Sequence, residues 1–156
     1  MLDSPLIKPA EGYLRDRWVP ADSGARMEVR NPATGAVIAE VPRMGAKETE
    51  EAIGHAVEAL AARPSLETRR GWLEKIHDQL LAQAPEIARV LTAEHGKPLA
   101  EARAEVEYAA GFFGFCAREI HRLAPRELDE HPKDCSWSVH HRPVGVVGLV
   151  TPWNFP

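Results

Sequence analysis

The segment that most constrains the fold lies near the C-terminal end, where an apolar run leads into a stiff turn. Residues 144–150 read Val-Gly-Val-Val-Gly-Leu-Val, a composition typical of a strand buried on both faces of a parallel sheet. Residues 151–156 follow as Thr-Pro-Trp-Asn-Phe-Pro. A buried strand needs neighbouring strands, and none follows Pro156. We therefore expect a truncated fragment that shows partial order, association, or dependence on a missing remainder.

The composition indicates a globular protein and argues against nucleic-acid or membrane partners. The 156 residues are 44% hydrophobic and 27% charged, with a net charge of −4. Nucleic acids and anionic membranes select concentrated positive charge, and no apolar run approaches the ~20 residues of a membrane-spanning helix. Two cysteines and an N-terminus without the features of a signal peptide favour a reduced, cytoplasmic setting.

Turn residues and apolar spacing predict two hairpins followed by helices. The hairpins are expected over residues 13–19, with Asp16 near the turn, and over residues 27–41. Helical spacing begins at Ala46, the charged run 47–51 is expected to be a solvated face, and Pro64 closes this helix. Residues 1–12 are rich in proline and are expected to form a surface tail.

Two further helices and a strand are predicted downstream. Ser65 is a plausible N-cap, and Pro85 should end that helix and begin a fresh one over residues 86–95, closed by Gly96. The longest helix is expected over residues 98–123. Residues 124–134 resemble a polar loop, and residues 135–142 alternate like a half-exposed strand. On the long helix, an apolar stripe includes Cys116, and two glycines are expected to allow close approach of another element: Gly111 and Gly114.

The closing turn, residues 151–156, contains residues that could take part in ligand binding or catalysis. It follows the carboxyl end of the predicted strand, where ligands bind in α/β sheets. Its two prolines fix φ at positions 152 and 156 and restrict the preceding residues. The carboxamide of Asn154 can donate a hydrogen bond to an oxyanion that develops during catalysis. The alternative is a proline-rich turn with a surface asparagine.

Other candidate sites are weaker. His131, Cys135, His140 and His141 match no standard zinc spacing, so no metal site is predicted. Lys97 beside Gly96 lacks the glycine and Ser/Thr pattern of a phosphate-binding P-loop.

Four stretches together resemble the N-terminal third of the aldehyde dehydrogenase superfamily, in the same order. The most specific is residues 143–148, Pro-Val-Gly-Val-Val-Gly, followed by Thr151-Pro-Trp-Asn-Phe-Pro156. The others are Asn31-Pro-Ala-Thr-Gly35, Glu94-His-Gly-Lys-Pro98 with residues 99–102, and residues 105–113. The sequence around Gly96-Lys-Pro98 and Tyr108-Ala-Ala is most similar to that of the succinate-semialdehyde dehydrogenases.

The resemblance implies oxidation of an aldehyde to a carboxylic acid with NAD or NADP, through a cysteine thioester. It implies that Asn154 stabilises the oxyanion, that Phe155 lies beside the aldehyde tunnel, and that the cofactor lies against Thr151, Pro152, Trp153 and Asn154. The family's nucleophile, its glutamate base and the lysine that holds the cofactor ribose correspond to positions after 156. Cys116 is expected to be core packing, and acidic neighbours disfavour a thiolate at Cys135.

The expected fold is therefore α/β and aldehyde dehydrogenase-like, with hairpins, a helical layer, an oligomerisation strand and the first strand of a Rossmann-like parallel sheet. Its parts are a tail (1–12), the hairpins and helices of the cofactor-binding domain (13–132), the oligomerisation strand (133–142), and the first strand with the catalytic turn (143–156). The implied whole enzyme is a homo-oligomer, a dimer or tetramer. The alternative function is a non-catalytic binding or oligomerisation module. The sequence leaves open NAD against NADP, the particular aldehyde and the oligomer order.

Overall fold

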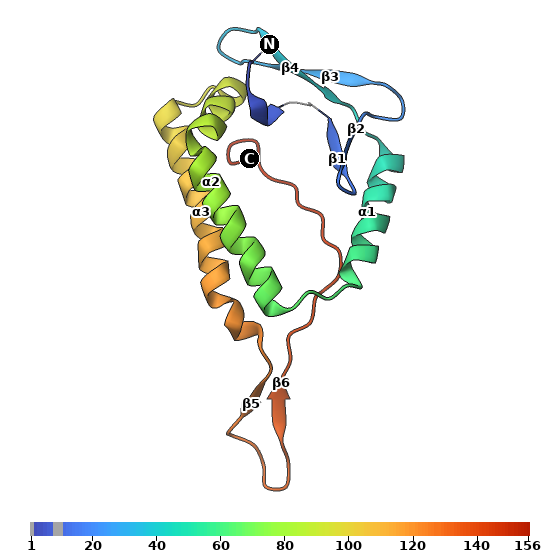
Figure 1. The fold of residues 1–156 in the computed structure, drawn as a ribbon, viewed down its shortest axis with the longest axis vertical. Coiled ribbons are helices and arrows are strands. Elements are labelled where there is room, and N and C mark those ends of the chain that lie inside the picture. The colour runs from blue at the N-terminus through green and yellow to red at the C-terminus, as the bar shows by residue number, and fades with distance from the viewer. Residues whose placement is uncertain (1, 8–10) are drawn as a thin grey trace.

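The computed structural model describes residues 2–7 and 11–156. Two long helices pack side by side, and a third helix with two small hairpins lies apart from them (Figure 1). A third hairpin projects away from this body, and the C-terminal segment runs back between the helices. Residues 1 and 8–10 of the predicted tail lie outside the described ranges. Among the described residues, no helix is long and apolar enough to cross a membrane.

Both predicted N-terminal hairpins are confirmed. Strand β1 (Gly12–Leu14) pairs antiparallel with β2 (Arg17–Val19), and Asp16 lies in the turn with a φ of 62°. Strand β3 (Arg26–Arg30) pairs antiparallel with β4 (Val37–Pro42). The turn between them is closed by the Asn31 side chain, whose Oδ1 accepts a hydrogen bond from the Ala33 N–H at 2.8 Å.

Helix α1 (Ala46–Leu60) confirms the predicted helix, but one residue of its charged run is not solvated. Glu48 is buried, and its carboxylate accepts hydrogen bonds from the backbone N–H groups of Asp22 and Gly45, both at 2.9 Å. The bond from Asp22 contributes most to holding the pKa of Glu48 below its ordinary value. The expectation of a fully exposed face was wrong here because the start of a helix leaves backbone donors that a carboxylate can satisfy.

Helix α2 (Leu66–His95) is one continuous helix, so the predicted break at Pro85 was wrong. Its start is confirmed, since the Ser65 hydroxyl accepts a hydrogen bond from the Thr68 N–H at 3.0 Å, and so is its end at Gly96, with a φ of 74°. A proline inside a helix costs about 3 kcal/mol. Packing against the next helix offsets this cost, because buried residues flank the proline on both sides: Ala84, Ala88 and Leu91.

Helix α3 (Leu99–Glu119) continues into the short 3-10 helix η2 (Ile120–Leu123) and packs along α2. Its buried face consists of Ala102, Val106, Ala110 and Ala117. Two expectations were wrong. α2, not α3, is the longest helix described, and Cys116 is exposed. Cys116 immediately precedes Ala117, and a turn of about 100° per residue carries it off the packed face.

The third hairpin contains a strand that the sequence did not predict. Strand β5 (Arg126–Leu128) lies within the predicted polar loop and pairs antiparallel with β6 (Trp137–Val139), with Leu128 opposite Trp137. Three residues without apolar alternation carry almost no strand signal of their own, and pairing with a partner creates the strand. The half-exposed strand expected over 135–142 is correspondingly short.

The predicted buried strand over residues 144–150 is not formed in the described chain. These residues lie in neither a helix nor a strand, and Val150 is 98% exposed. Each of the three sheets described here has two antiparallel strands, and none borders this segment. Without a partner for its backbone N–H and C=O groups, an apolar run cannot form a strand.

The N-terminal residues do not form a loose surface tail throughout. The Leu2 N–H donates to the Ile38 carbonyl at 2.7 Å, and Ser4 is fully buried. The turn of 3-10 helix η1 (Pro5–Ile7) follows. This segment therefore connects strand β4 to helix α2.

Candidate functional site

The closing turn lies beside the first half of helix α3, since Asn154 and Phe155 line the same hollow as Glu101 and Glu105. The Phe155 N–H donates to the Pro152 carbonyl at 3.2 Å, which closes the turn. All six residues of the turn are exposed, including Trp153 at 85% and Phe155 at 58%. The turn thus presents its side chains at the surface.

One lysine connects this turn to the helical pair. The Lys97 Nζ donates to the Asn154 main-chain carbonyl at 3.0 Å and lies 5.4 Å from the centroid of the Phe155 ring. The same ammonium forms an ion pair with Glu105 on α3. The Lys97 and Glu105 side chains are only 16% and 14% exposed, so the pair is largely shielded from water.

A hollow of about 490 Å³ joins these residues. The turn contributes Asn154 and Phe155, the link between α2 and α3 contributes Lys97, and the first half of α3 contributes Glu101, Ala104, Glu105 and Tyr108. Of the predicted site residues, Thr151, Pro152 and Trp153 are not part of this lining. The structure therefore brings two of the five predicted residues together with a group of residues that were not predicted.

The sequence contained a signal for Lys97 and Glu105 that site prediction missed. Both lie in the stretches that resemble the aldehyde dehydrogenases, but Lys97 was considered only as a phosphate-binding residue. Gly96 ends α2 in the left-handed conformation, and a Cβ there would lie 2.9 Å from the Pro32 ring. Pro98 immediately precedes α3. A lysine in so short and rigid a link has a fixed position, which is the property that a site residue needs.

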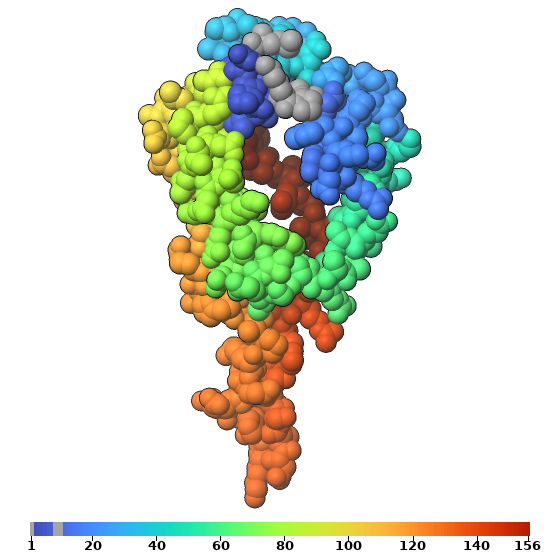
Figure 2. Space-filling view, viewed as in Figure 1, coloured from blue at the N-terminus to red at the C-terminus, as the bar shows by residue number. Residues whose placement is uncertain are grey.

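A larger hollow of about 810 Å³ lies between the β1–β2 hairpin and α2. Figure 2 shows the molecule open between these elements, with the C-terminal segment visible behind. Its lining includes Tyr13, Trp72 and Ile76 but none of the predicted site residues. Volume alone does not identify a site, so we assign the chemistry to the smaller hollow, where polar groups converge.

The cysteines and histidines form no comparable centre. Cys116 and Cys135 are both exposed and free. No group of three histidine, cysteine or acidic side chains suited to a metal ion occurs in the described part of the chain. His140 Nε2 is instead hydrogen-bonded to the Ser138 hydroxyl at 3.0 Å.

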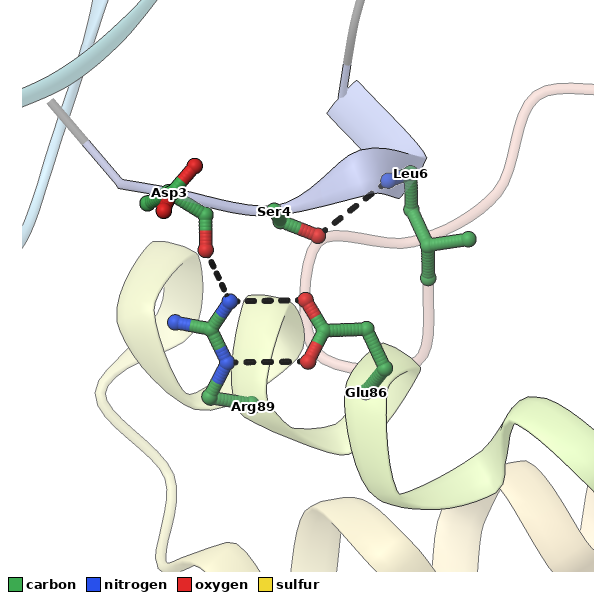
Figure 3. A network of polar contacts seen from close by, with 5 residues as sticks. All are labelled: Asp3, Ser4, Leu6, Glu86 and Arg89. Atoms are coloured by element: carbon green, nitrogen blue, oxygen red, sulfur yellow. Dashed lines mark hydrogen bonds and ion pairs between the residues drawn. The ribbon is translucent and has the colours of Figure 1, made fainter.

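A second polar cluster ties the N-terminal residues to helix α2 (Figure 3). Arg89 forms two hydrogen bonds with the Glu86 carboxylate, at 2.7 and 3.0 Å, and a third with the Asp3 carbonyl. The bonds from Arg89, and then that from the buried Ser4, lower the pKa of Glu86 to about 2. This cluster is a structural connection and lies apart from the closing turn.

Comparison with known proteins assigns most of the chain to one family. Residues 18–156 match the sequence profile of the Aldehyde dehydrogenase family. Glutarate-semialdehyde dehydrogenase of Pseudomonas aeruginosa is 40% identical over 99% of this chain and 32% of its own length. The chain thus spans about a third of the curated relatives it matches, in their N-terminal part.

Solved structures agree with this assignment. The crystal structure of succinate-semialdehyde dehydrogenase from Burkholderia pseudomallei is 38% identical, with a TM-score of 0.90 over 99% of this chain and 33% of that one. A betaine aldehyde dehydrogenase from Staphylococcus aureus, solved with NAD+, is 26% identical, with a TM-score of 0.89 over 97% of this chain and 32% of that one. The likeness confirms the expected aldehyde dehydrogenase-like fold class at the level of the N-terminal portion.

Proposed function

Because this chain belongs to the aldehyde dehydrogenase family, we propose that it supplies the oxyanion donor and part of the cofactor surface of an NAD(P)-dependent aldehyde dehydrogenase. The enzyme oxidises an aldehyde to a carboxylic acid. The observation that carries the proposal is the exposed closing turn, which presents Asn154 while Lys97 holds its backbone. The relatives named as semialdehyde dehydrogenases favour a substrate such as succinate semialdehyde.

Asn154 is the catalytic residue of this proposal. Its carboxamide makes no hydrogen bond to another of the described residues and is exposed, so both N–H bonds are free to donate. A neutral donor suits a transient negative charge, because it stabilises the oxyanion without binding an anion permanently. Removing one such donor costs about 2.7–4 kcal/mol of transition-state stabilisation.

Thr151, Pro152 and Trp153, with Asn154, form the proposed cofactor surface. The residues fit a nicotinamide cofactor: the turn is exposed, stiffened by proline, uncharged, and has a broad aromatic face at Trp153. When bound, this cofactor supplies the hydride acceptor. NAD and NADP both agree with the residues present. Phe155, at the edge of the hollow, is the proposed wall of the aldehyde tunnel.

The proposal assigns the nucleophile to neither cysteine of this chain. Cys116 lies on the outside of α3, and Cys135 lies in the projecting hairpin. The resemblance to the family implies that the thiolate that forms the thioester and the base that activates water correspond to positions outside these 156 residues. We expect the chain alone to be inactive and propose the cytoplasm as its compartment.

The projecting β5–β6 hairpin favours a homo-oligomer, either a dimer or a tetramer. It extends beyond the body of the molecule, and an exposed strand edge is suited to pairing with another chain (Figure 1). The same feature supports the second candidate function, a non-catalytic binding or oligomerisation module. Activity measurements separate the two candidates.

The test combines the intact mass of the purified native protein with its aldehyde-dependent production of NAD(P)H. We expect an active protein with a mass above the 17.2 kDa of these 156 residues. In that protein, Asn154→Ala should lower kcat by about 10²–10³-fold. Activity that persists undiminished in the variant would remove Asn154 from catalysis. An inactive native protein that assembles through the β5–β6 hairpin would favour the binding module.

A further inference from the structure

Lys97 makes three contacts within the chain, and together they satisfy its ammonium group without a bound ligand. Its ammonium forms an ion pair with Glu105, donates to the Asn154 carbonyl, and lies over the Phe155 ring. An ammonium has three N–H bonds, and the three partners here are a carboxylate, a carbonyl oxygen and the face of an aromatic ring. Its charge is therefore balanced within the chain.

The elements that hold Lys97 are rigid. It stands between the left-handed Gly96, which lies close beneath the Pro32 ring, and Pro98. Its partner Glu105 is one helical turn from Ala102 and adjacent to Val106, both of which are buried against α2. Both members of the pair are thus fixed by the packing of the helices.

The closing turn has few other connections. Its own hydrogen bond joins Phe155 to Pro152, within the turn itself. The backbone bond from Lys97 to Asn154 joins it to the helical pair. A hydrogen bond to the main-chain carbonyl limits how the peptide unit that follows Asn154 can move, and because that unit is planar it also limits where the Cα atom of Asn154 can lie. Lys97 therefore constrains the backbone from which the Asn154 side chain extends.

We propose that Lys97, oriented by Glu105, is the positioning residue that aims the Asn154 carboxamide. The role in catalysis rests on the proposed function, whereas the mechanical role does not. Lys97 is not a receptor for an anionic substrate group in this arrangement, because Glu105 neutralises it. Nor is it an oxyanion donor, since it acts on the backbone of the residue that donates.

The experiment measures the order of the turn and, separately, the enzymatic activity, both in the native protein. Backbone ¹⁵N relaxation gives order parameters for Trp153, Asn154 and Phe155. In the unaltered chain we expect values near about 0.85, and in Lys97→Met values below about 0.6. Glu105→Gln should loosen the turn in the same direction, and Lys97→Arg, which retains the charge and donors, should preserve its order.

Arg103→Met is the matched control. It also removes a cation that pairs with a carboxylate of α3, Glu107 at 3.0 Å, but the two side chains are 61% and 50% exposed. Neither lines the hollow beside the turn. The turn should stay ordered in this variant. If Lys97→Met disrupts the helices, as far-ultraviolet circular dichroism would show, the comparison of Glu105→Gln with Lys97→Arg decides.

A turn that is already mobile in the unaltered chain, or one that stays ordered in both Lys97→Met and Glu105→Gln, would overturn the proposal. In the native enzyme, Lys97→Met should lower kcat roughly 10²-fold through misplacement of Asn154, with little change in the KM for aldehyde. Loosening of the turn in a native protein without dehydrogenase activity would refute the proposed function and leave the positioning role standing. The two failures are therefore distinguishable.

Discussion

Adding a methyl group at Gly114 tests the contact between helices α2 and α3. A Cβ at this position would lie 3.1 Å from the His77 Nδ1 and 3.2 Å from its Cε1. That Nδ1 is also 2.8 Å from the Ala110 carbonyl, with which it forms a hydrogen bond between the two helices. Gly111 lies three residues earlier in the same helix, and a Cβ there would meet no atom within 4 Å.

The two glycines lie in the same helix and differ in the neighbour that the added methyl group meets. Replacing a helical glycine by alanine stabilises a protein by about 1 kcal/mol when the site is open. We expect this full gain for Gly111→Ala. At Gly114 the methyl group displaces His77, and loss of its hydrogen bond costs about 0.5–1.5 kcal/mol. The net effect of Gly114→Ala should therefore lie between about +0.5 and −0.5 kcal/mol.

Urea unfolding at pH 7, followed by circular dichroism, measures the difference. Gly111→Ala should raise the midpoint clearly, and Gly114→Ala should leave it nearly unchanged. In a His77→Ala background, Gly114→Ala should regain a stabilisation of about 1 kcal/mol, because the obstructing ring is gone. Equal stabilisation by the two alanines in the unaltered background would refute the reasoning, since it would show that His77 moves aside without cost.

Two further predictions concern the N-terminal connection and the cysteines. Because Arg89, and then Ser4, lower the pKa of Glu86 from 4.5 to about 2, this carboxylate stabilises the fold fully above about pH 4.5 and progressively less as the pH falls towards 2. Glu86→Gln should remove that part of the acid dependence in unfolding measured from pH 6 to pH 2, and an unchanged dependence would contradict the assigned cause. Both cysteines should react with a thiol reagent in the folded chain. If Cys116 or Cys135 reacts only after denaturant is added, the exposure found for that cysteine is wrong.

Local signals in the sequence predicted the elements that depend on local physics. The hairpin turns, the Ser65 cap and the left-handed Gly96 each rest on a residue whose own side chain or backbone freedom creates the feature. The break at Pro85 failed for the opposite reason. The cost of the proline is local, but the packing that offsets it involves residues on another helix.

The residues of the candidate site also divide into those that the local sequence indicates and those that only tertiary packing brings together. Asn154 and Phe155 were predicted from the resemblance, which places them in a specific motif, and both line the hollow. Lys97 and Glu105 were missed as site residues because their role exists only when the turn, the link and α3 lie together. Residues 144–150 show the reverse case, in which a strong strand pattern remains unpaired for want of a neighbouring strand.

The alanine-rich contact between the helices links the packing of the fold to the geometry of the turn. Ala88, Ala102 and Ala110 are completely buried, and such small side chains allow two helices to approach closely. This contact fixes the register of α3 against α2, and the register sets the distance between Lys97, in the link after α2, and Glu105, in the second turn of α3. The pair in turn holds the Asn154 carbonyl. If Lys97 positions Asn154 as we propose, helix packing sets the place of the Asn154 backbone, and the two prolines of the turn add stiffness to it.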